Sequence, residues 1–275
     1  MPFSAKGVTL ASATGACFFF FWLGSLILSW VILPVASLPL RRRPRIERIH
    51  RCQDIVGRAF RLFIAGMRVT RTLVFRPRRV ELNLPDGPFV MIANHPTLID
   101  VTALMTVHPR ICCIAKSELF ASAFVGPLLR RCGHIESGSR GLADREFVLR
   151  QALDRIAAGL PVLVFPEGSR SPEQGLRRFK DGAFEIAARA GVPIVPVLIT
   201  CDPPTLKKGS QWYGLPKRTA WYDVTQLRPD LSRVPANGAG AMAAHFHELF
   251  LAELDKWKAT LPELGFVPPH GLTQS

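Results

Sequence analysis

An uncharged run of 18 residues near the N-terminus is the feature that most constrains how this chain can fold. Residues 16–33 read ACFFFFWLGSLILSWVIL, and as a helix they would extend about 27 Å, close to the hydrocarbon thickness of a bilayer. Trp22 and Trp30 suit anchoring at a membrane interface. Pro34 and Pro39 predict the end of the helix, because proline cannot donate a helical hydrogen bond. The run therefore predicts an N-terminal transmembrane helix.

The charge on either side of this run predicts its orientation. Between Arg41 and Arg79 there are thirteen arginines but only two acidic residues, so eleven of the fourteen net positive charges fall in 39 residues. Before the run, Lys6 is the lone basic residue. By the positive-inside rule this asymmetry predicts a single-pass protein of the inner or cytoplasmic membrane, with the later residues facing the cytoplasm. A cleaved signal peptide, with Val35-Ala36-Ser37 as its cleavage site, is the alternative.

From residue 46 onward the sequence has the pattern of a basic amphipathic helix. Apolar residues recur at helical spacing: Ile49, Val56, Phe60, Phe63 and Met67. Arginines occupy much of the remaining circumference: Arg48, Arg51, Arg58, Arg61 and Arg68. This pattern is typical of a helix lying among anionic lipid headgroups, and equally of a helix packed on a domain with solvated arginines. Both can hold at once. The few aromatic residues in the basic run disfavour nucleic acid as the partner.

Beyond the turn signal LPDG, short apolar runs alternate with helical patterns. This alternation predicts an α/β fold, a single domain with a mostly parallel sheet flanked by helices and preceded by the transmembrane helix and the basic amphipathic helix. The clearest helix starts near Ala143 and stops at Gly159, and a last amphipathic helix covers about Ala241 to Lys258. The predicted parts are a membrane anchor (1–40), a basic amphipathic membrane-proximal segment (41–84) and a catalytic domain that includes the C-terminal helix (85–275).

The six cysteines show no C-x-x-C pair and no Cys/His metal spacing. They predict reduced, buried thiols and no metal site. The adjacent Cys112 and Cys113 in RICCIA are expected to act as small hydrophobic residues in a strand rather than as reactive thiols.

The stretch NHPTLID places a histidine and a carboxylate where a strand gives way to a helix. His95 and Asp100 are five residues apart, about 140° on a continuous helix, so they cannot share a helical face. A loop histidine and an aspartate in the first helical turn could still converge. Such a carboxylate can orient an imidazole that acts as a general base. Taken alone, a His-Asp pair of this spacing is also typical of a structural contact.

Two further strand-to-loop junctions carry charged residues. In VFPEGSRS, Arg170 could grip a phosphate, and Glu167 could accept hydrogen bonds from substrate hydroxyls or orient the arginine; a plain surface turn is the alternative. In GHIESGSR (133–140), a solvated loop competes with a functional interpretation. The chain has no G-x-S-x-G elbow, P-loop or G-x-G-x-x-G, which argues against serine hydrolases, nucleotide triphosphatases and dinucleotide-binding enzymes.

Together, the order and spacing of these blocks resemble the glycerolipid acyltransferase family, which includes 1-acyl-glycerol-3-phosphate acyltransferase. NHPTLID matches the family's N-H-x4-D block, FPEGSRS its F-P-E-G-[ST]-R-S block, and VPIVPV its late V-P-[IV]-[IV]-P-V block. RRFKDGAFEIA resembles the segment between the last two. The chain departs from the pattern at GHIES, where Ser137 replaces the arginine of G-x-[IV]-x-[DE]-R. Arg140 could supply that charge from three residues on.

The resemblance implies transfer of a fatty acyl group from acyl-CoA or acyl-carrier protein to a hydroxyl of a lysophospholipid, most directly 1-acyl-glycerol-3-phosphate, in phospholipid biosynthesis. It implies His95 as the general base and Asp100 as the residue that orients it. The implied acceptor-binding residues are Glu167, Gly168, Ser169, Arg170 and Arg140. Pro196 is expected to set a loop beside the site. No cofactor or metal is implied, and membrane lipids are the expected partners.

Two alternatives stay open at this point. The acceptor could be another lipid, such as an amino-acid lipid or a specialised lipid, because Ser137 departs from the family pattern. The chain could also be a catalytically inactive, membrane-tethered binding protein that kept the fold. The sequence predicts neither the acyl chain length nor the oligomeric state.

Overall fold

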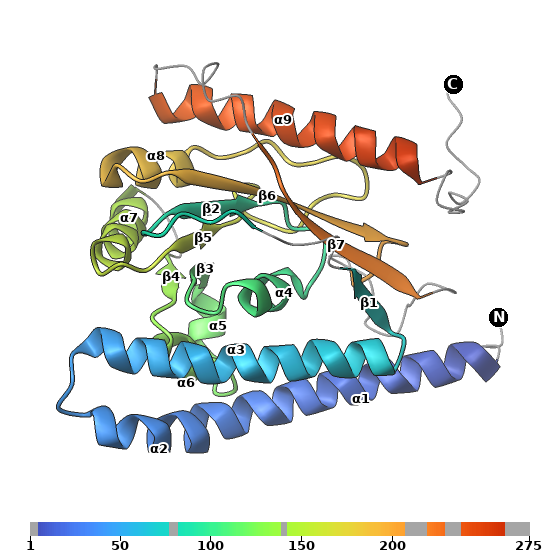
Figure 1. Ribbon diagram of the computed structural model, residues 1–275, viewed down its shortest axis with the longest axis horizontal. Coiled ribbons are helices and arrows are strands. Elements are labelled where there is room, and N and C mark those ends of the chain that lie inside the picture. Colours follow the sequence, from blue (N-terminus) through green and yellow to red (C-terminus); the bar gives the residue numbers. More distant parts are fainter. Residues whose placement is uncertain (1–4, 77–81, 139–141, 207–218, 229–237, 262–275) are drawn as a thin grey trace.

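A computed structural model describes residues 5–76, 82–138, 142–206, 219–228 and 238–261. In these residues a twisted sheet lies between two layers of helices, which confirms the predicted α/β class (Figure 1). The strands are β1 (Leu73–Arg76), β2 (Val90–Ala93), β3 (Cys112–Lys116), β4 (Ile135–Ser137), β5 (Val162–Val164), β6 (Ile194–Asp202) and β7 (Ala220–Gln226).

The described strands form one sheet in the order β1-β7-β6-β2-β5-β3-β4. Neighbouring strands are parallel except for β6 and β7, which are antiparallel. The sheet is therefore mostly parallel, as predicted. Because β1 pairs with β7, the segment predicted as a separate membrane-proximal unit (41–84) contributes a strand to the sheet. The predicted boundary at residue 84 consequently cuts through one folded domain.

Both faces of the sheet are covered, which explains the apolar character of the central strands. On β2, Met91 and Ala93 face a core shared with α3 (Arg45–Val69) and α4 (Asp100–Val107). Val90 and Ile92 face a second core on the opposite side. The remaining helices are α5 (Ser117–Ala121) and α6 (Gly126–Arg131) on the α4 side, and α7 (Leu142–Ala157), α8 (Gly182–Ala190) and α9 (Gly238–Thr260) on the other.

The helices α7 and α9 confirm two sequence predictions. Leu149 and Ile156 on α7 are buried in the second core, and Gly159 follows the helix with φ +81°, the left-handed conformation that glycine tolerates. The predicted C-terminal helix corresponds to α9, which buries Phe246 and Phe250.

The N-terminal apolar run forms one long helical segment rather than ending at Pro34. It comprises α1 (Ala5–Ile27), a π-helical turn η1 (Leu28–Ile32), α2 (Leu33–Ser37) and a 3₁₀ turn η2 (Leu38–Leu40). In the π turn the N–H of Leu33 donates to the carbonyl of Leu28, five residues earlier. A wider turn before proline accommodates its ring, so the prediction that Pro34 ends the helix was wrong.

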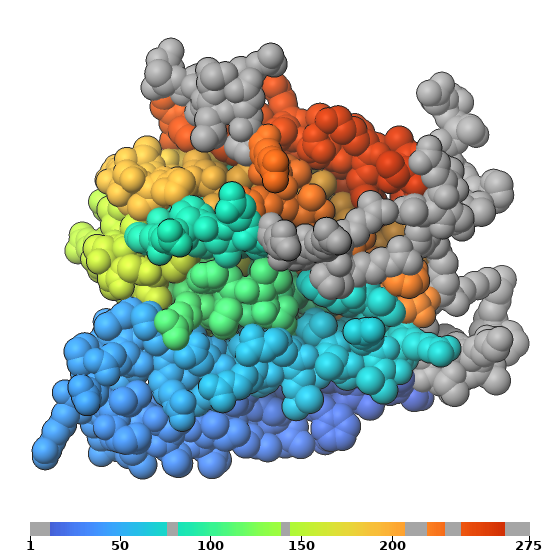
Figure 2. All heavy atoms as spheres, in the orientation of Figure 1, coloured from blue at the N-terminus to red at the C-terminus, as the bar shows by residue number. Residues whose placement is uncertain are grey.

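This helical segment runs alongside α3 in the opposite direction and packs on the domain (Figure 1). Ser29 Oγ donates to the carbonyl of Phe124 at 2.6 Å, and Trp30 Nε1 donates to the carbonyl of Ala123 at 2.9 Å. Figure 2 shows the two N-terminal helices as a continuous layer along one side of the molecule. The apolar run is thus part of the folded body and not a detached anchor.

The outward face of this layer is strongly apolar. Among the described residues, Ser12–Leu40 is the one helix long and apolar enough to cross a membrane. Large side chains on it lie more than half exposed: Phe19, Phe20, Trp30, Val31 and Val35. An exposed apolar surface of this kind indicates association with a membrane.

Candidate active site

His95 and Asp100 meet as the sequence predicted. His95 lies in the loop between β2 and α4, and Asp100 is the first residue of α4. Nδ1 of His95 lies 2.7 Å from Oδ2 of Asp100. The carboxylate is fully buried, whereas 20% of the histidine side chain is exposed. Because Nδ1–H donates a hydrogen bond to the carboxylate, Nε2 is the nitrogen left free to take a proton from a ligand.

Asp100 is held by three further hydrogen bonds. The backbone N–H of Thr97 donates to Oδ2 at 2.8 Å, and the Thr97 hydroxyl donates to Oδ1. The hydroxyl of Tyr222, on β7, donates to Oδ1 at 2.9 Å. Burial, together with the Asp100 charge, raises the pKa of Tyr222 well above its usual value, so this hydroxyl stays protonated. Together these donors fix the orientation of the Asp100 carboxylate.

Glu167 joins the second sequence block to the first. Oε1 accepts the backbone N–H of His95 at 3.0 Å and the hydroxyl of Ser171 at 2.6 Å. Oε2 accepts the backbone N–H of Arg177 at 2.9 Å. The N–H of Ser171 in turn donates to the carbonyl of His95 at 2.7 Å. Glu167 is only 3% exposed and is not among the residues that line the cavity, and its carboxylate fixes the loop of His95.

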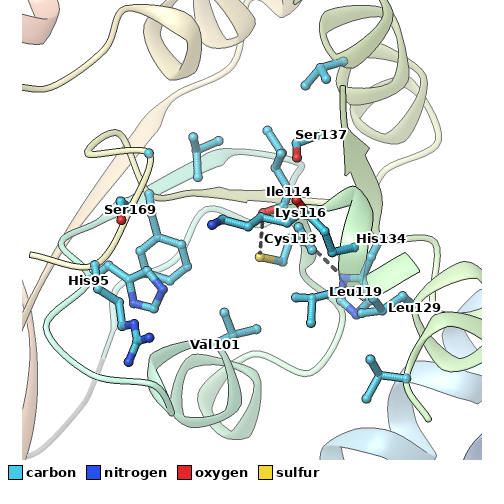
Figure 3. Close-up of a pocket in the computed structure, with 18 of the residues that line it drawn as sticks. His95, Val101, Cys113, Ile114, Lys116, Leu119, Leu129, His134, Ser137 and Ser169 are labelled. Carbon is cyan, nitrogen blue, oxygen red and sulfur yellow. Dashed lines mark hydrogen bonds between the residues drawn. The ribbon is translucent and has the colours of Figure 1, made fainter. Parts of the chain in front are cut away.

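The next three residues of this block do line the cavity. Gly168 has φ +67°, and a Cβ placed there would lie 2.9 Å from Nζ of Lys180. The positive φ of the turn therefore favours glycine here, and the lysine side chain lies directly against it. Ser169 lines the cavity on the same side as His95 (Figure 3). Arg170 lines the cavity while its Nη1 donates to the carbonyl of Leu206 at 3.0 Å.

The cavity that these residues border has a volume of about 1160 Å³ and mostly apolar walls. It extends beneath α4 and α6 to the N-terminal helices, whose Phe21 and Phe63 also line it. Figure 3 shows His95 and His134 toward opposite ends, with Cys113 and Lys116 of β3 between them. One wall of the cavity is thus built by the membrane-associated layer.

Lys116 is a cavity residue that the sequence did not point to. It ends β3, where the carboxyl ends of parallel strands gather functional residues. Its exposed side chain lines the cavity together with Arg170 and Lys180. The sequence could have indicated Lys116 because it is a cation that directly follows the apolar run RICCIA. It lies at the same sheet edge as His95.

Ser137, which replaces the family arginine, ends β4 and lines the cavity. Its carbonyl accepts the hydroxyl of Ser117. Arg140, predicted to compensate for it, lies outside the described residues.

Cys112 and Cys113 are confirmed as buried thiols without a disulfide partner. Burial raises the pKa of both to about 12, so neither is a thiolate near neutral pH.

Comparisons with known proteins agree with this site. A family model described as Acyltransferase matches residues 77–200. Over 121 residues the chain is 36% identical to a 1-acyl-sn-glycerol-3-phosphate acyltransferase of Chlamydomonas reinhardtii. Over 118 residues it is 34% identical to the human 1-acyl-sn-glycerol-3-phosphate acyltransferase alpha. Over residues 77–200 the chain is therefore similar to the family that this model describes as Acyltransferase.

The residues that the family model matches include the two blocks that meet at His95. The two alignments cover 44% and 42% of this chain, and 36% and 42% of the relatives, so the chain spans less than half the length of either one. A crystal structure of the 1-acyl-sn-glycerophosphate acyltransferase PlsC from Thermotoga maritima has the same fold. Its TM-score is 0.71 at 21% identity, and the match covers 92% of this chain and 98% of that one.

Proposed function

We propose that this protein is an O-acyltransferase that moves a fatty acyl group from acyl-CoA or acyl-carrier protein to the hydroxyl of a lysophospholipid, most directly 1-acyl-glycerol-3-phosphate. The observation that carries the proposal is the buried Asp100 carboxylate 2.7 Å from Nδ1 of a partly exposed His95, beside an apolar cavity large enough for acyl chains. The names of the aligned relatives support this acceptor.

His95 would act as the general base. Nε2 takes the proton of the acceptor hydroxyl as its oxygen attacks the thioester carbonyl. The tetrahedral intermediate collapses, the carbon–sulfur bond breaks, and the departing thiolate takes the proton from the imidazolium. Asp100 stays ionised and stabilises the imidazolium, so no covalent acyl-enzyme is required. The ring of Phe165 stacks on His95 at 4.3 Å and limits its rotation.

Three of the basic residues that line the cavity suit an anionic acceptor. Arg170, Lys116 and Lys180 all line the cavity that His95 borders. A guanidinium can bind a phosphate in a bidentate manner, and ammonium groups add charge without fixed geometry. We assign the acceptor phosphate to this cluster. Gly168 and Ser169 would shape the same site, and Glu167 would hold its loop in place.

The packing of the N-terminal helices supports an orientation along the membrane. If α1 crossed the bilayer, the antiparallel α3 would enter the bilayer with it. Four exposed arginines of α3 would then lie in hydrocarbon: Arg51, Arg58, Arg61 and Arg68. Each would cost about 2.5–3.5 kcal/mol of insertion free energy. We therefore propose that the helix pair lies in the cytoplasmic leaflet, in preference to the single-pass orientation that the sequence predicts. A membrane-impermeant thiol reagent should fail to label Lys6→Cys from the extracytoplasmic side, whereas a spanning helix would expose that position.

The activity is tested by incubating the purified full chain with labelled acyl-CoA or acyl-carrier protein and a panel of acceptors. The panel contains 1-acyl-glycerol-3-phosphate, other lysophospholipids and a lyso amino-acid lipid. We expect labelled product with a lysophospholipid. Product with the amino-acid lipid alone would support the alternative acceptor. No labelled lipid with any donor and acceptor would support the inactive binding protein.

A further inference from the structure

Three polar side chains line the apolar part of the cavity although they are almost completely buried. Ser25 of α1 is 4% exposed, Thr102 of α4 is 7% exposed, and His134, directly before β4, is 4% exposed. Their neighbours in the cavity wall are apolar, including Met105 and Leu129. Polar groups in such surroundings are normally paired, so each of the three calls for a partner.

His134 presents a hydrogen-bond donor to the cavity. Its Nδ1 accepts the backbone N–H of Cys113 at 3.0 Å, which leaves the proton of the neutral ring on Nε2. Burial, with a smaller effect from Arg155, lowers the pKa of His134 to about 4, so the ring is neutral at pH 7. Within the described part of the chain, Nε2 has no hydrogen-bond partner, and the ring lies at the cavity end remote from His95 (Figure 3).

The hydroxyls of Ser25 and Thr102 lack the hydrogen bond that serine and threonine commonly make within a helix. Ser and Thr in a helix commonly donate to a carbonyl three or four residues earlier. Thr106 does so to Ala103 at 2.7 Å, one turn after Thr102 on the same helix. Neither Ser25 nor Thr102 makes such a bond with any described residue, although both line the cavity. Both hydroxyls can therefore donate to, or accept from, a bound molecule.

His134 lies away from the reacting end of the cavity (Figure 3). Lys116 and Ser137 are paired at the carboxyl ends of β3 and β4. His134 precedes Ser137 by three residues, which corresponds to about 10 Å along the strand. An acyl chain whose thioester lies at His95 would therefore pass His134 along its length and not at its carbonyl end.

We infer that this cavity selects an acyl chain that carries an oxygen substituent, such as a hydroxyl, part-way along its length. The inference rests on the proposed function for the identity of the ligand as an acyl donor. A hydroxyl at the depth of His134 would accept from Nε2 of His134, and Ser25 and Thr102 would offer further hydrogen-bond partners within the same cavity. An unsubstituted chain would leave these buried groups without partners, which disfavours its binding.

The test measures binding by the full chain, so that it does not depend on turnover. Hydrolysis-resistant S-alkyl thioethers of coenzyme A serve as probes, one unsubstituted and a series of equal length hydroxylated at successive mid-chain carbons. We expect one or two positions of the hydroxyl to bind about tenfold more tightly than the unsubstituted chain. Transfer from the corresponding thioesters is measured in parallel.

Three variants remove the polar groups with little change of shape: Ser25→Ala, Thr102→Val and His134→Asn, whose amide oxygen can still accept from Cys113. Each should reduce the preference for the hydroxylated chain. Thr106→Val is the matched control and should retain it. Equal binding of all the probes, or a preference that survives all three variants, overturns the inference. A preference in binding without transfer in the parallel assay would uphold the inference while refuting the proposed activity.

Discussion

Tyr222 donates a hydrogen bond to Asp100 although it lies outside the residues that the family model matches. Replacing Tyr222 by phenylalanine removes only this hydroxyl. The Tyr222→Phe ring would keep its place and its stacking on Phe75 at 5.6 Å. What it loses is a hydrogen bond of 2.9 Å from a completely buried donor to a carboxylate. Bonds to charged groups contribute about 1.5–3 kcal/mol. Because Oδ1 of Asp100 keeps the Thr97 hydroxyl, we expect the lower end, about 1.5 kcal/mol.

The loss should affect catalysis as well as stability. If Asp100 orients His95, loosening the carboxylate should lower kcat up to about tenfold, since each 1.36 kcal/mol corresponds to one decade. The KM values for donor and acceptor should change little, because Tyr222 does not line the cavity. Unfolding in denaturant and steady-state transfer provide the two readouts.

Phe75→Leu is the matched control for this substitution. It removes packing against the Tyr222 ring without touching the hydroxyl, so it should lower stability and leave kcat unchanged. The reasoning is refuted if Tyr222→Phe keeps full kcat, or if both variants lower kcat in proportion to their loss of stability.

Three further predictions concern other residues of the cavity region. Glu167→Gln places an amide where both carboxylate oxygens accept, so it should lose about 1–3 kcal/mol of stability and much of the activity, with calorimetry and transfer rates as the measurements. Arg170→Ala should raise the acceptor KM about tenfold or more while Arg170→Lys retains part of the binding, and unchanged acceptor kinetics would remove the phosphate assignment. Because the pKa of His134 falls from 6.5 to about 4 on folding, the unfolded chain binds a proton between these values that the folded chain does not. Stability should therefore fall by about 3 kcal/mol as the pH drops through this window, and His134→Asn should flatten the urea midpoints measured across it.

The sequence predicted the meeting of His95 and Asp100 because both lie within one loop and one helical turn. Local spacing alone excluded a shared helical face and left a loop-to-helix contact. The site's third contributor, Tyr222, could not be found in this way. It arrives from β7, 122 residues after Asp100, through the antiparallel pairing of β6 with β7. No local pattern encodes that distant pairing.

Glu167 shows a different limit of the sequence. A carboxylate in a strand-end turn was expected to face the acceptor, since such turns often carry function. In the structure the backbone N–H groups of His95 and Arg177 converge on it and turn it inward. The direction of a side chain depends on which donors the folded loops supply, and that information is absent from the spacing of residues.

Two prolines lie inside regular elements that the sequence did not predict for them. Pro34 lies inside the long N-terminal helical segment because a π turn precedes it. Pro196 was expected in a loop beside the site but lies within β6, in register with Ile92 of β2. Its carbonyl still accepts the N–H of Leu227, so the strand loses only the donor that proline lacks.

The central claim is that His95 is the base of an acyl transfer reaction, and one comparison tests it most directly. Transfer from a labelled acyl donor to the preferred lysophospholipid is measured for the wild-type chain, His95→Ala and His50→Ala, with thermal unfolding as the check on folding. His50, on α3, does not line the cavity. We predict that His95→Ala remains folded but loses about 10²- to 10⁴-fold in rate, whereas His50→Ala retains full activity. A folded His95→Ala variant that transfers acyl groups at the wild-type rate would contradict the account.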